Sequence, residues 1–375
     1  MNGVRNAVLP GLAAVAVAVA SGVAMAAGPA TAATAGTRSP AQTAYVADAG
    51  SVTVTPINTA TNDAGHPIRV GGDPQAIAIT PNGKTAYVVN HGPGTVTPID
   101  TATNKAEPSI KVGPSPRAIA ITPDGKTAYV ANSGSGTVTP ISTVTNKAEP
   151  SIKVGAGPRA IAITPNGKTA YVINRGSGTV TPINTATNKA GPPIKVGAGP
   201  RAIAISPSGK TVYVANVGSG TVTPISTATN KASPAIKTGE RARAIAITPS
   251  GRTVYVANAG SSTVTPITAA TRKPGPAIKV GRNPWAIAIT PDGGTAYVVD
   301  HRSGEVTPIS TVTRKPGPAI KVGQRPMTIA ITPDGMTAYV ANTGSGTVTP
   351  INTATNNAGP AIKTGASPWA IAITP

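Results

Sequence analysis

The chain has no cysteine and no phenylalanine among its 375 residues, and only three histidines and two tryptophans. Without cysteine there is no disulfide and no thiolate metal site, so packing alone must hold the fold together. The few histidines leave little material for acid–base catalysis. Stacking aromatics are also nearly absent, so we do not expect a nucleic-acid partner.

Acidic residues are scarce as well. Twelve Asp and Glu face 32 Lys and Arg, which gives a formal net charge of +20. A surface of this kind attracts polyanions such as nucleic acid, anionic lipid or cell-wall polymer. Many of the lysines recur once in each unit of the repeat described below, so we interpret much of the charge as a distributed, solvated shell.

Glycine and proline are abundant, at 42 and 39 residues, and they separate short clusters of Val, Ile and Thr. Such clusters predict an all-β protein. The regular placement of Ile, Val and Tyr argues against a disordered chain, although the Gly and Pro content alone could indicate one.

The first 32 residues differ from the rest. An Ala- and Val-rich run follows Arg5 and leads into a stretch of small residues. This layout predicts a secretory signal peptide over residues 1–32, with cleavage after Ala26 or Ala32, then a short linker over 33–39. The alternative is an uncleaved membrane anchor, because about 20 apolar residues can span a bilayer. We favour the cleaved signal, since alanine is weakly hydrophobic, and we expect a secreted, possibly envelope-associated protein with no membrane span after cleavage.

A 42-residue repeat dominates the remainder, without insertion or deletion. The tyrosines mark it: Tyr45, Tyr87, Tyr129, Tyr171, Tyr213, Tyr255, Tyr297 and Tyr339. Each unit holds four strand-like pieces, which we name A to D in chain order. In one unit they are Ala118–Thr122, Thr127–Asn132, Thr137–Ile141 and Ser151–Val154. Four short antiparallel strands per unit predict a β-propeller blade.

The phase of the repeat predicts how the ring closes. Residues 40–375 make eight units, but the chain enters at strand B (Ala44–Ala47) and leaves after strand A (Ala370–Thr374). We therefore expect an eight-bladed propeller in which the C-terminal strand A joins the N-terminal strands B, C and D, because open edges would otherwise remain. Seven blades with a leftover piece is the less economical count.

Two repeated features concern the outer strands. Strand D carries a lysine, or Arg69 in the first unit, and a lysine on an edge strand opposes sheet-to-sheet aggregation. Strand C contains a proline at the same place in all eight units, for example Pro140. Proline cannot donate to a ladder, so we expect it to end or bulge strand C and to leave only a short pairing with D.

The recurring ITPDGKTAYVANSGSGTVTPI and IKVG segments resemble the YVTN-repeat β-propellers over residues 40–375. The resemblance implies a secreted or surface protein of bacterial type and says little about activity. Related propellers include lactonases, a streptogramin-cleaving lyase and quinoprotein dehydrogenases. The chain departs from the common pattern by the proline in strand C.

Function must lie where the units differ, on the face that carries the D–A and B–C loops. The residue before each AIAI segment varies most. It is Gln75 in one unit, and in the others it forms the predicted ligand site: Arg117, Arg159, Arg201, Arg243, Trp285, Met327 and Trp369. In a ring these form a basic arc, joined by Arg175, opposite an aromatic and mixed arc. Arginine suits carboxylate or phosphate and tryptophan supplies apolar area, so we expect an anionic, partly apolar ligand or a partner peptide.

Catalysis has weaker support. His91 and His301 are expected on the ligand face but three blades apart, and Asp300 follows strand B where most units have Asn. Together they could form a metal or acid–base site only in a narrow channel mouth. We expect no metal and no cofactor.

The sequence therefore predicts an extracellular binding or scaffold propeller, monomeric, with a protein or an anionic ligand as partner. One alternative is a lactonase- or lyase-like enzyme that uses His91, His301 and Asp300. Another is electrostatic adhesion to anionic cell-wall polymer.

Overall fold

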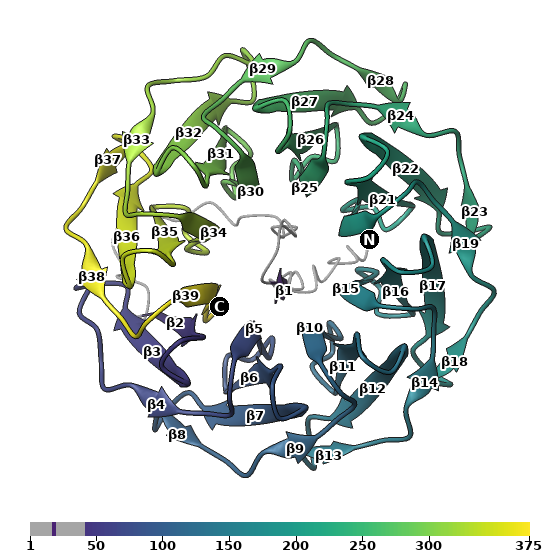
Figure 1. The fold of residues 1–375 in the computed structure, drawn as a ribbon, viewed down its shortest axis with the longest axis vertical. Helices are drawn as coiled ribbons and strands as arrows, with labels where there is room; N and C mark the ends of the chain where they lie inside the picture. The colour runs from purple at the N-terminus through teal and green to yellow at the C-terminus, as the bar shows by residue number, and fades with distance from the viewer. Residues whose placement is uncertain (1–16, 20–41) are drawn as a thin grey trace, which may run out of the picture.

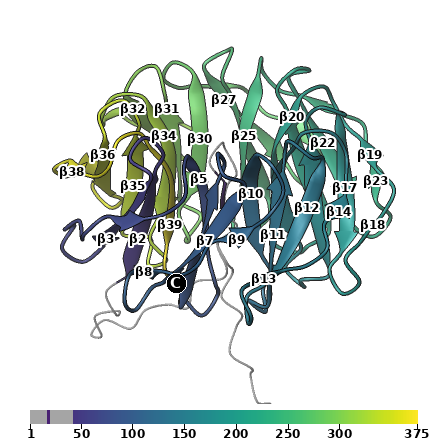
Figure 2. The same ribbon diagram turned by 60° about the horizontal axis from the view of Figure 1, so that its bottom comes forward.

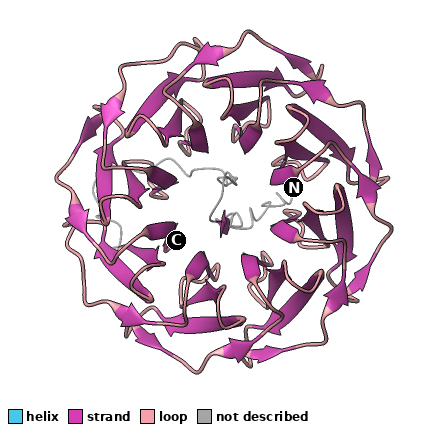
Figure 3. Ribbon diagram, viewed as in Figure 1, coloured by secondary structure: helices cyan, strands magenta, loops and turns pink. Residues whose placement is uncertain are grey.

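The computed structural model describes residues 17–19 and 42–375. Residues 42–375 form eight antiparallel sheets that stand as blades around a central channel (Figures 1 and 2). The prediction of an eight-bladed propeller is confirmed. The described residues contain only strands, turns and loops (Figure 3), and they include no helix that is long and apolar enough to cross a membrane.

Each blade runs outward from the channel through three six-residue strands. The innermost strands are β5 (Pro74–Ile79), β10 (Pro116–Ile121), β15 (Pro158–Ile163), β20 (Pro200–Ile205), β25 (Ala242–Ile247), β30 (Pro284–Ile289), β34 (Pro326–Ile331) and β39 (Pro368–Ile373). The second strands are β2 (Thr43–Asp48), β6 (Thr85–Asn90), β11 (Thr127–Asn132), β16 (Thr169–Asn174), β21 (Thr211–Asn216), β26 (Thr253–Asn258), β31 (Thr295–Asp300) and β35 (Thr337–Asn342). The third strands are β3 (Thr53–Asn58), β7 (Thr95–Asp100), β12 (Thr137–Ser142), β17 (Thr179–Asn184), β22 (Thr221–Ser226), β27 (Thr263–Thr268), β32 (Glu305–Ser310) and β36 (Thr347–Asn352).

The outer strands have only two residues each: β4 (Ile68–Arg69), β9 (Ile110–Lys111), β14 (Ile152–Lys153), β19 (Ile194–Lys195), β24 (Ile236–Lys237), β29 (Ile278–Lys279), β33 (Ile320–Lys321) and β38 (Ile362–Lys363). In six blades a second two-residue piece pairs with the far end of the third strand: β8 (Lys105–Ala106), β13 (Lys147–Ala148), β18 (Lys189–Ala190), β23 (Lys231–Ala232), β28 (Lys273–Pro274) and β37 (Asn357–Ala358). Strand D is thus shorter than predicted and divided. The Lys or Arg of each outer strand is exposed, as an edge strand requires.

One further short strand, β1 (Val17–Val19), pairs antiparallel with β5 in the channel (Figure 1). It belongs to the predicted signal peptide, whose other residues lie outside the described part, as do the linker residues 33–39. The signal peptide and its cleavage site therefore stay predictions.

The ring closes through the two ends of the repeat. Strand β39 pairs with β2, with Ala372 opposite Tyr45, in the same register as Ala120 and Tyr129 inside a continuous blade. The closing blade is therefore a complete sheet of β39, β2, β3 and β4, as the phase of the repeat predicts.

The hydrophobic cores lie between blades. Each blade presents alanines of its innermost strand and the tyrosine of its second strand to the next blade. Ile and Val side chains of that next blade pack against them. Between the closing blade and its successor, Ala370, Ala372 and Tyr45 pack against Ile77 and Val88. The described residues form eight such clusters, including the one across the closure. Because apolar burial is the main favourable contribution to folding, the ring is the stabilised unit rather than the blade.

Six of the eight tyrosines also donate a hydrogen bond to an asparagine of the next blade. The hydroxyl of Tyr129 donates to Asn188 Oδ1 at 2.6 Å, and that of Tyr339 donates to Asn62 across the closure at the same distance. These asparagines occupy the left-handed region, with φ of 53° at Asn188 and 63° at Asn62. Asparagine tolerates this conformation better than other residues that carry a side chain, which explains its recurrence in the C–D loop.

The proline of the third strand does not end that strand. Pairing between β11 and β12 runs without a break through Tyr129 and Pro140. The carbonyl of Pro140 instead accepts the N–H of Glu149 from the outer strand at 2.8 Å, and all eight prolines do the same. The N–H and C=O of one residue point to the same side of a strand. Because the Pro140 carbonyl points outward, the N–H that proline lacks would also have pointed outward, and pairing with β11 loses no hydrogen bond.

The outer strand bulges opposite this proline. Ile141 pairs with Ala148 and Val138 pairs with Ile152. Between these two pairs the outer segment has one residue more than β12 has. The expected bulge is therefore in the outer strand, and strand C itself stays regular. Short, bulged and lysine-bearing edges make poor templates for another sheet.

Two units lack the link from tyrosine to asparagine, although the Tyr255 hydroxyl still donates to the carbonyl of Thr311 at 3.3 Å. Beyond Tyr213 and Tyr255, the loop position of the asparagine holds Arg272 and Arg314, both with φ of 57°. We expect Arg272→Asn to raise the free energy of unfolding by about 1 kcal/mol, because it relieves left-handed strain and gives the Tyr213 hydroxyl an acceptor. Urea unfolding measures the change. The exposed Arg252→Asn is the matched control, and an equal effect of both substitutions would contradict the assignment.

Candidate functional site

Two loops of each blade form one continuous face. The B–C loop, between the second and third strands, donates backbone N–H groups to the D–A loop, which leads into the innermost strand. In one blade His301 N–H donates to the carbonyl of Asn283 and Arg302 N–H to that of Arg282, at 3.2 and 3.1 Å. Residues of these loops therefore share a surface around the channel mouth.

A β-bulge sets the column of residues before the AIAI segments. In β10, Pro116 pairs with Asn132 and Ala118 with Ala131, which leaves Arg117 as the extra residue. The same register shift occurs in all eight blades. The innermost strand therefore begins two residues earlier than predicted, and a bulge redirects the side chain that it carries.

The channel arginines are the four of that column: Arg117, Arg159, Arg201 and Arg243. Arg201 and Arg243 are only 7% and 5% exposed. Buried Nε atoms without a hydrogen-bond partner among the described residues occur in Arg159, Arg201 and Arg243. Such atoms are costly unless they find an acceptor, so these three Nε atoms have an unmet hydrogen-bonding requirement among the described residues.

The charges around the channel arginines are all positive. Burial lowers the pKa of Arg159, Arg201 and Arg243, and the neighbouring guanidinium groups lower it further. No carboxylate among the described residues offsets these effects on the three pKa values. Since a guanidinium keeps its proton at neutral pH, the cluster carries electrostatic repulsion that a bound anion would relieve.

Trp285 joins the basic arc to the aromatic one. The Arg243 Cζ lies 2.9 Å from the centroid of its ring, and the Arg201 Cζ lies 5.7 Å from it. The His301 ring stacks on Trp285 with centroids 4.5 Å apart and an interplanar angle of 29°. The two arcs, predicted to lie opposite each other, therefore meet at this residue. Cation–π contacts of this kind fix the positions of the groups they join.

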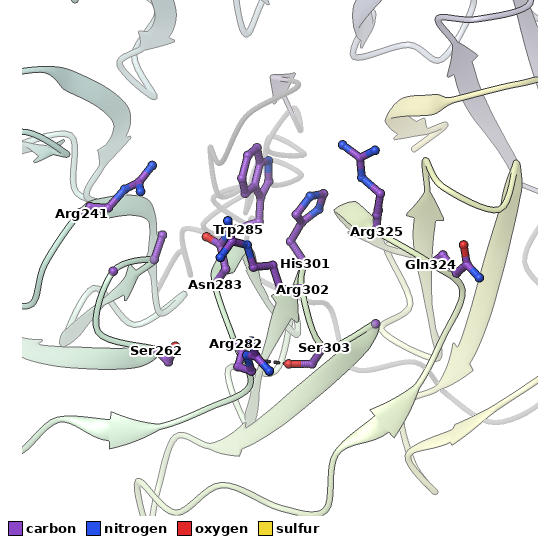
Figure 4. Close-up of a pocket in the computed structure, with 13 residues that line it drawn as sticks. Arg241, Ser262, Arg282, Asn283, Trp285, His301, Arg302, Ser303, Gln324 and Arg325 are labelled. Atoms are coloured by element: carbon purple, nitrogen blue, oxygen red, sulfur yellow. Dashed lines mark hydrogen bonds between the residues drawn. The ribbon is translucent and has the colours of Figure 1, made fainter.

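A large open cavity lies over this point (Figure 4). Its volume is about 870 Å³, and Trp285 and His301 stand in its wall. The described residues that line it include four arginines and no acidic residue: Arg241, Arg282, Arg302 and Arg325. We call it the arginine cavity. Sequence comparison of the AIAI column alone missed these four, because they lie in other columns of the same loops.

Backbone strain marks two of the four. Arg241 and Arg325 have φ of 57° and 51°, in the left-handed region that disfavours a side chain. Two sister blades place Gly157 and Gly199 at the same position, each with φ of 61°. The left-handed backbone is common to this loop, because Asp73, Ser115, Asn283 and Ser367 adopt it in the other four blades, with φ of 52° to 58°. What sets these two blades apart is the arginine, and this departure from the repeat was the available sequence signal.

A smaller pocket adjoins the cavity and shares Trp285, His301 and Arg325 with it. Its volume is about 200 Å³, and Met327 and Trp369 complete its apolar wall. We call it the aromatic pocket. The structure thus brings together Arg243, Trp285, Met327 and Trp369 of the predicted ligand site, while Arg117 lies farther along the ring, where it donates to Gln75 and Ser133.

The histidines have separate environments. His301 Nδ1 lies 2.9 Å from the carbonyl oxygen of Pro326, and His91 Nδ1 lies 3.0 Å from that of Pro116. Burial lowers the pKa of His301. Only His301 is in the wall of the arginine cavity, and the described residues contain no group of three His, Asp or Glu placed to hold a metal ion.

Asp300 is part of the blade framework. It is fully buried and accepts a hydrogen bond from Thr307 at 2.6 Å, as Asp48 does from Thr55. In the other units an asparagine fills this place and donates to the same threonine, as Asn132 does to Thr139 at 2.8 Å. The glycine that follows strand D leaves no room here, since a Cβ on Gly281 would lie 2.6 Å from Asp300.

These two aspartates make stability depend on pH. Burial raises the pKa of Asp48 to about 6 and that of Asp300 to about 7. The folded state then holds these protons more tightly than the unfolded state, so the stability that these two groups contribute is greatest below about pH 4 and falls as pH rises towards 7. We expect Asp48→Asn and Asp300→Asn to remove this dependence and to stabilise the protein at pH 8, by at most about 3 to 4 kcal/mol each.

Urea midpoints of the variants and the parent protein at pH 4, 6 and 8 test this expectation. The difference between each variant and the parent should grow with pH. A difference that is the same at all three pH values would show that the two carboxyl groups are ionised as easily in the fold as in the unfolded chain.

Comparisons with known proteins agree with the fold. A family model described as a lactonase with a seven-bladed β-propeller matches residues 141–312, less than half of this eight-bladed chain. None of the curated proteins matches. Among solved structures, hydrazine synthase of Kuenenia stuttgartiensis is 27% identical with a TM-score of 0.62, and the match covers 74% of this chain and 95% of that one.

Two further solved structures share the fold alone. The dihydro-haem d1 dehydrogenase NirN is 15% identical with a TM-score of 0.74, over 95% of this chain and 80% of its own. The apo form of AztD from Citrobacter koseri is 14% identical with a TM-score of 0.69, over 89% of this chain and 98% of its own. The chain is therefore a β-propeller, similar to these proteins in architecture.

Proposed function

We propose that this protein is an exported, YVTN-type binding propeller whose loop face holds an anionic ligand in the arginine cavity. One observation carries the proposal: four arginines converge on one cavity in which the described lining has no acidic residue. All four side chains are exposed, so water and salt screen their mutual repulsion and its cost in the empty protein is small. A ligand with carboxylate or phosphate groups would accept charge-assisted hydrogen bonds from them.

The channel arginines support the same proposal. Arg201 and Arg243 bring further positive charge next to Trp285, with Nε atoms that lack a partner among the described residues. The lysines of the outer strands are exposed on the rim and belong to a different surface. Binding in the cavity should therefore be separable by substitution from weak attraction of polyanions to the rim.

A second candidate is a lactonase- or lyase-like enzyme. The lactonase model matches a segment that contains His301, and the ring of His301 lies in the cavity wall with Nδ1 held on a backbone carbonyl. If Nδ1 carries the proton, Nε2 is free to act as a base. Hydrolysis of lactones by the parent protein, abolished in His301→Ala, would favour this candidate. Binding without turnover would favour the first one.

The binding proposal predicts opposite effects on affinity and stability. We expect Arg241→Gly and Arg325→Gly each to weaken pyrophosphate binding by about tenfold or more, because each removes a charged donor. Neither should lower the free energy of unfolding, since glycine suits the left-handed backbone at both positions. Calorimetric titration and urea unfolding measure the two effects.

The exposed pair Arg69→Gln and Arg252→Gln is the control for net charge. It removes two positive charges outside the cavity and should leave pyrophosphate affinity within about twofold of the parent value. Equal losses in the control and in the cavity variants would mean that pyrophosphate binds to the charged surface in general, and would contradict a site in the arginine cavity.

A further inference from the structure

The aromatic pocket and the arginine cavity form one composite surface. They share Trp285, His301 and Arg325, so a single molecule can occupy both. The two parts differ in chemistry. Arginines gather over blades β25–β29 and β30–β33, whereas the pocket continues towards β34 and β39 with Met327 and Trp369.

The apolar part is built from residues that break the repeat. At the same column position, three blades have Trp285, Met327 and Trp369, and four others have arginine. Met327 is 5% exposed, and both tryptophans are half-buried beside it. Trp369 packs against the core between the closing blade and the next one. The cores of blades with arginine form without such a side chain, so the framework does not require one at this position. The aromatic pocket is therefore a local addition to the framework.

The size of the pocket limits what it admits. An apolar cavity of about 150 Å³ holds one benzene molecule. The aromatic pocket, at about 200 Å³, has room for one six-membered ring or a short branched aliphatic group. Burial of such a group beside tryptophan and methionine is favourable in proportion to the apolar area covered.

The ring of Trp285 itself is not a free stacking platform. Arg243 and His301 lie against it, and both contacts are already made in the empty protein. An apolar group has room beyond Trp285, beside Met327 and Trp369, and a charged group attached to it would lie among the arginines. Arg325 stands at the boundary and can contact both ends.

We propose that the ligand is an amphipathic anion, with a phosphate- or carboxylate-type head in the arginine cavity and one aromatic or compact aliphatic group in the aromatic pocket. This inference rests on the proposed function and specifies its ligand class. It also fixes the orientation of the ligand, with the head over β30–β33 and the apolar group towards β34 and the closing strand β39.

Two probes of equal charge and different apolar size test the proposal. Phenylphosphonate and methylphosphonate carry the same head, and calorimetric titration compares their affinities. We expect phenylphosphonate to bind the parent protein at least tenfold more tightly. Met327→Ala and Trp369→Ala should each lose most of this advantage and keep the methylphosphonate affinity within about twofold, since the arginines are intact. Gln75→Ala is the matched control, in the same column but outside both pockets.

The outcomes separate the two proposals. Equal affinities of the two probes for the parent protein would overturn the amphipathic ligand and leave anion binding in place. An advantage of phenylphosphonate that persists in both variants would also overturn it, because the ring would then bind elsewhere. Binding of neither probe would contradict both proposals. The unchanged affinity for methylphosphonate shows in each case that a variant is folded.

Discussion

No blade of this protein can bury its apolar surfaces alone, because every core lies between two blades. The Ala and Tyr face of one blade packs on the Ile and Val face of the next, and the closure between β39 and β2 makes the last such core possible. A change in these residues disturbs a neighbour as well as its own blade. The strict repeat follows from this constraint, and so does the confinement of variation to the loops and the bulged column.

The same constraint explains how charge is arranged. Lysines lie on the outer strands, where they are solvated and oppose association. They recur at the same position of the strand around the ring. Arginines instead gather on the inner loop face at blades that depart from the repeat. There the framework carries a cost that folding alone does not require: the buried guanidinium groups of Arg201 and Arg243, whose pKa no acidic neighbour in the described part of the chain raises. Anion binding at this face, as proposed above, would offset that cost.

Much of the fold could be predicted from the sequence because it repeats. Strand β11 spans the predicted Thr127–Asn132, and the phase of the repeat gave the closing blade. The bulge at Arg117 and the divided outer strand were missed, since hydrogen-bond register depends on the partner strand. For the site, the AIAI column predicted Trp285, Met327 and Trp369 near one another. The sequence could not show that four other arginines share one cavity, because their loops come together only in the folded ring: Arg241, Arg282, Arg302 and Arg325. Asp300 was a candidate catalytic residue, but its carboxylate is buried and accepts a hydrogen bond from Thr307 of the blade framework.

The central claim is that the arginine cavity, and not the charged surface as a whole, binds anions. A crystal soaked in selenate and measured at the selenium absorption edge tests it most directly, because the anomalous signal locates the anion without assumptions. The account predicts the strongest peak between Arg241, Arg282, Arg302 and Arg325, and its loss in a crystal of the Arg241→Gly, Arg325→Gly double variant. Peaks confined to the lysines of the outer strands, with none in the cavity, would contradict it.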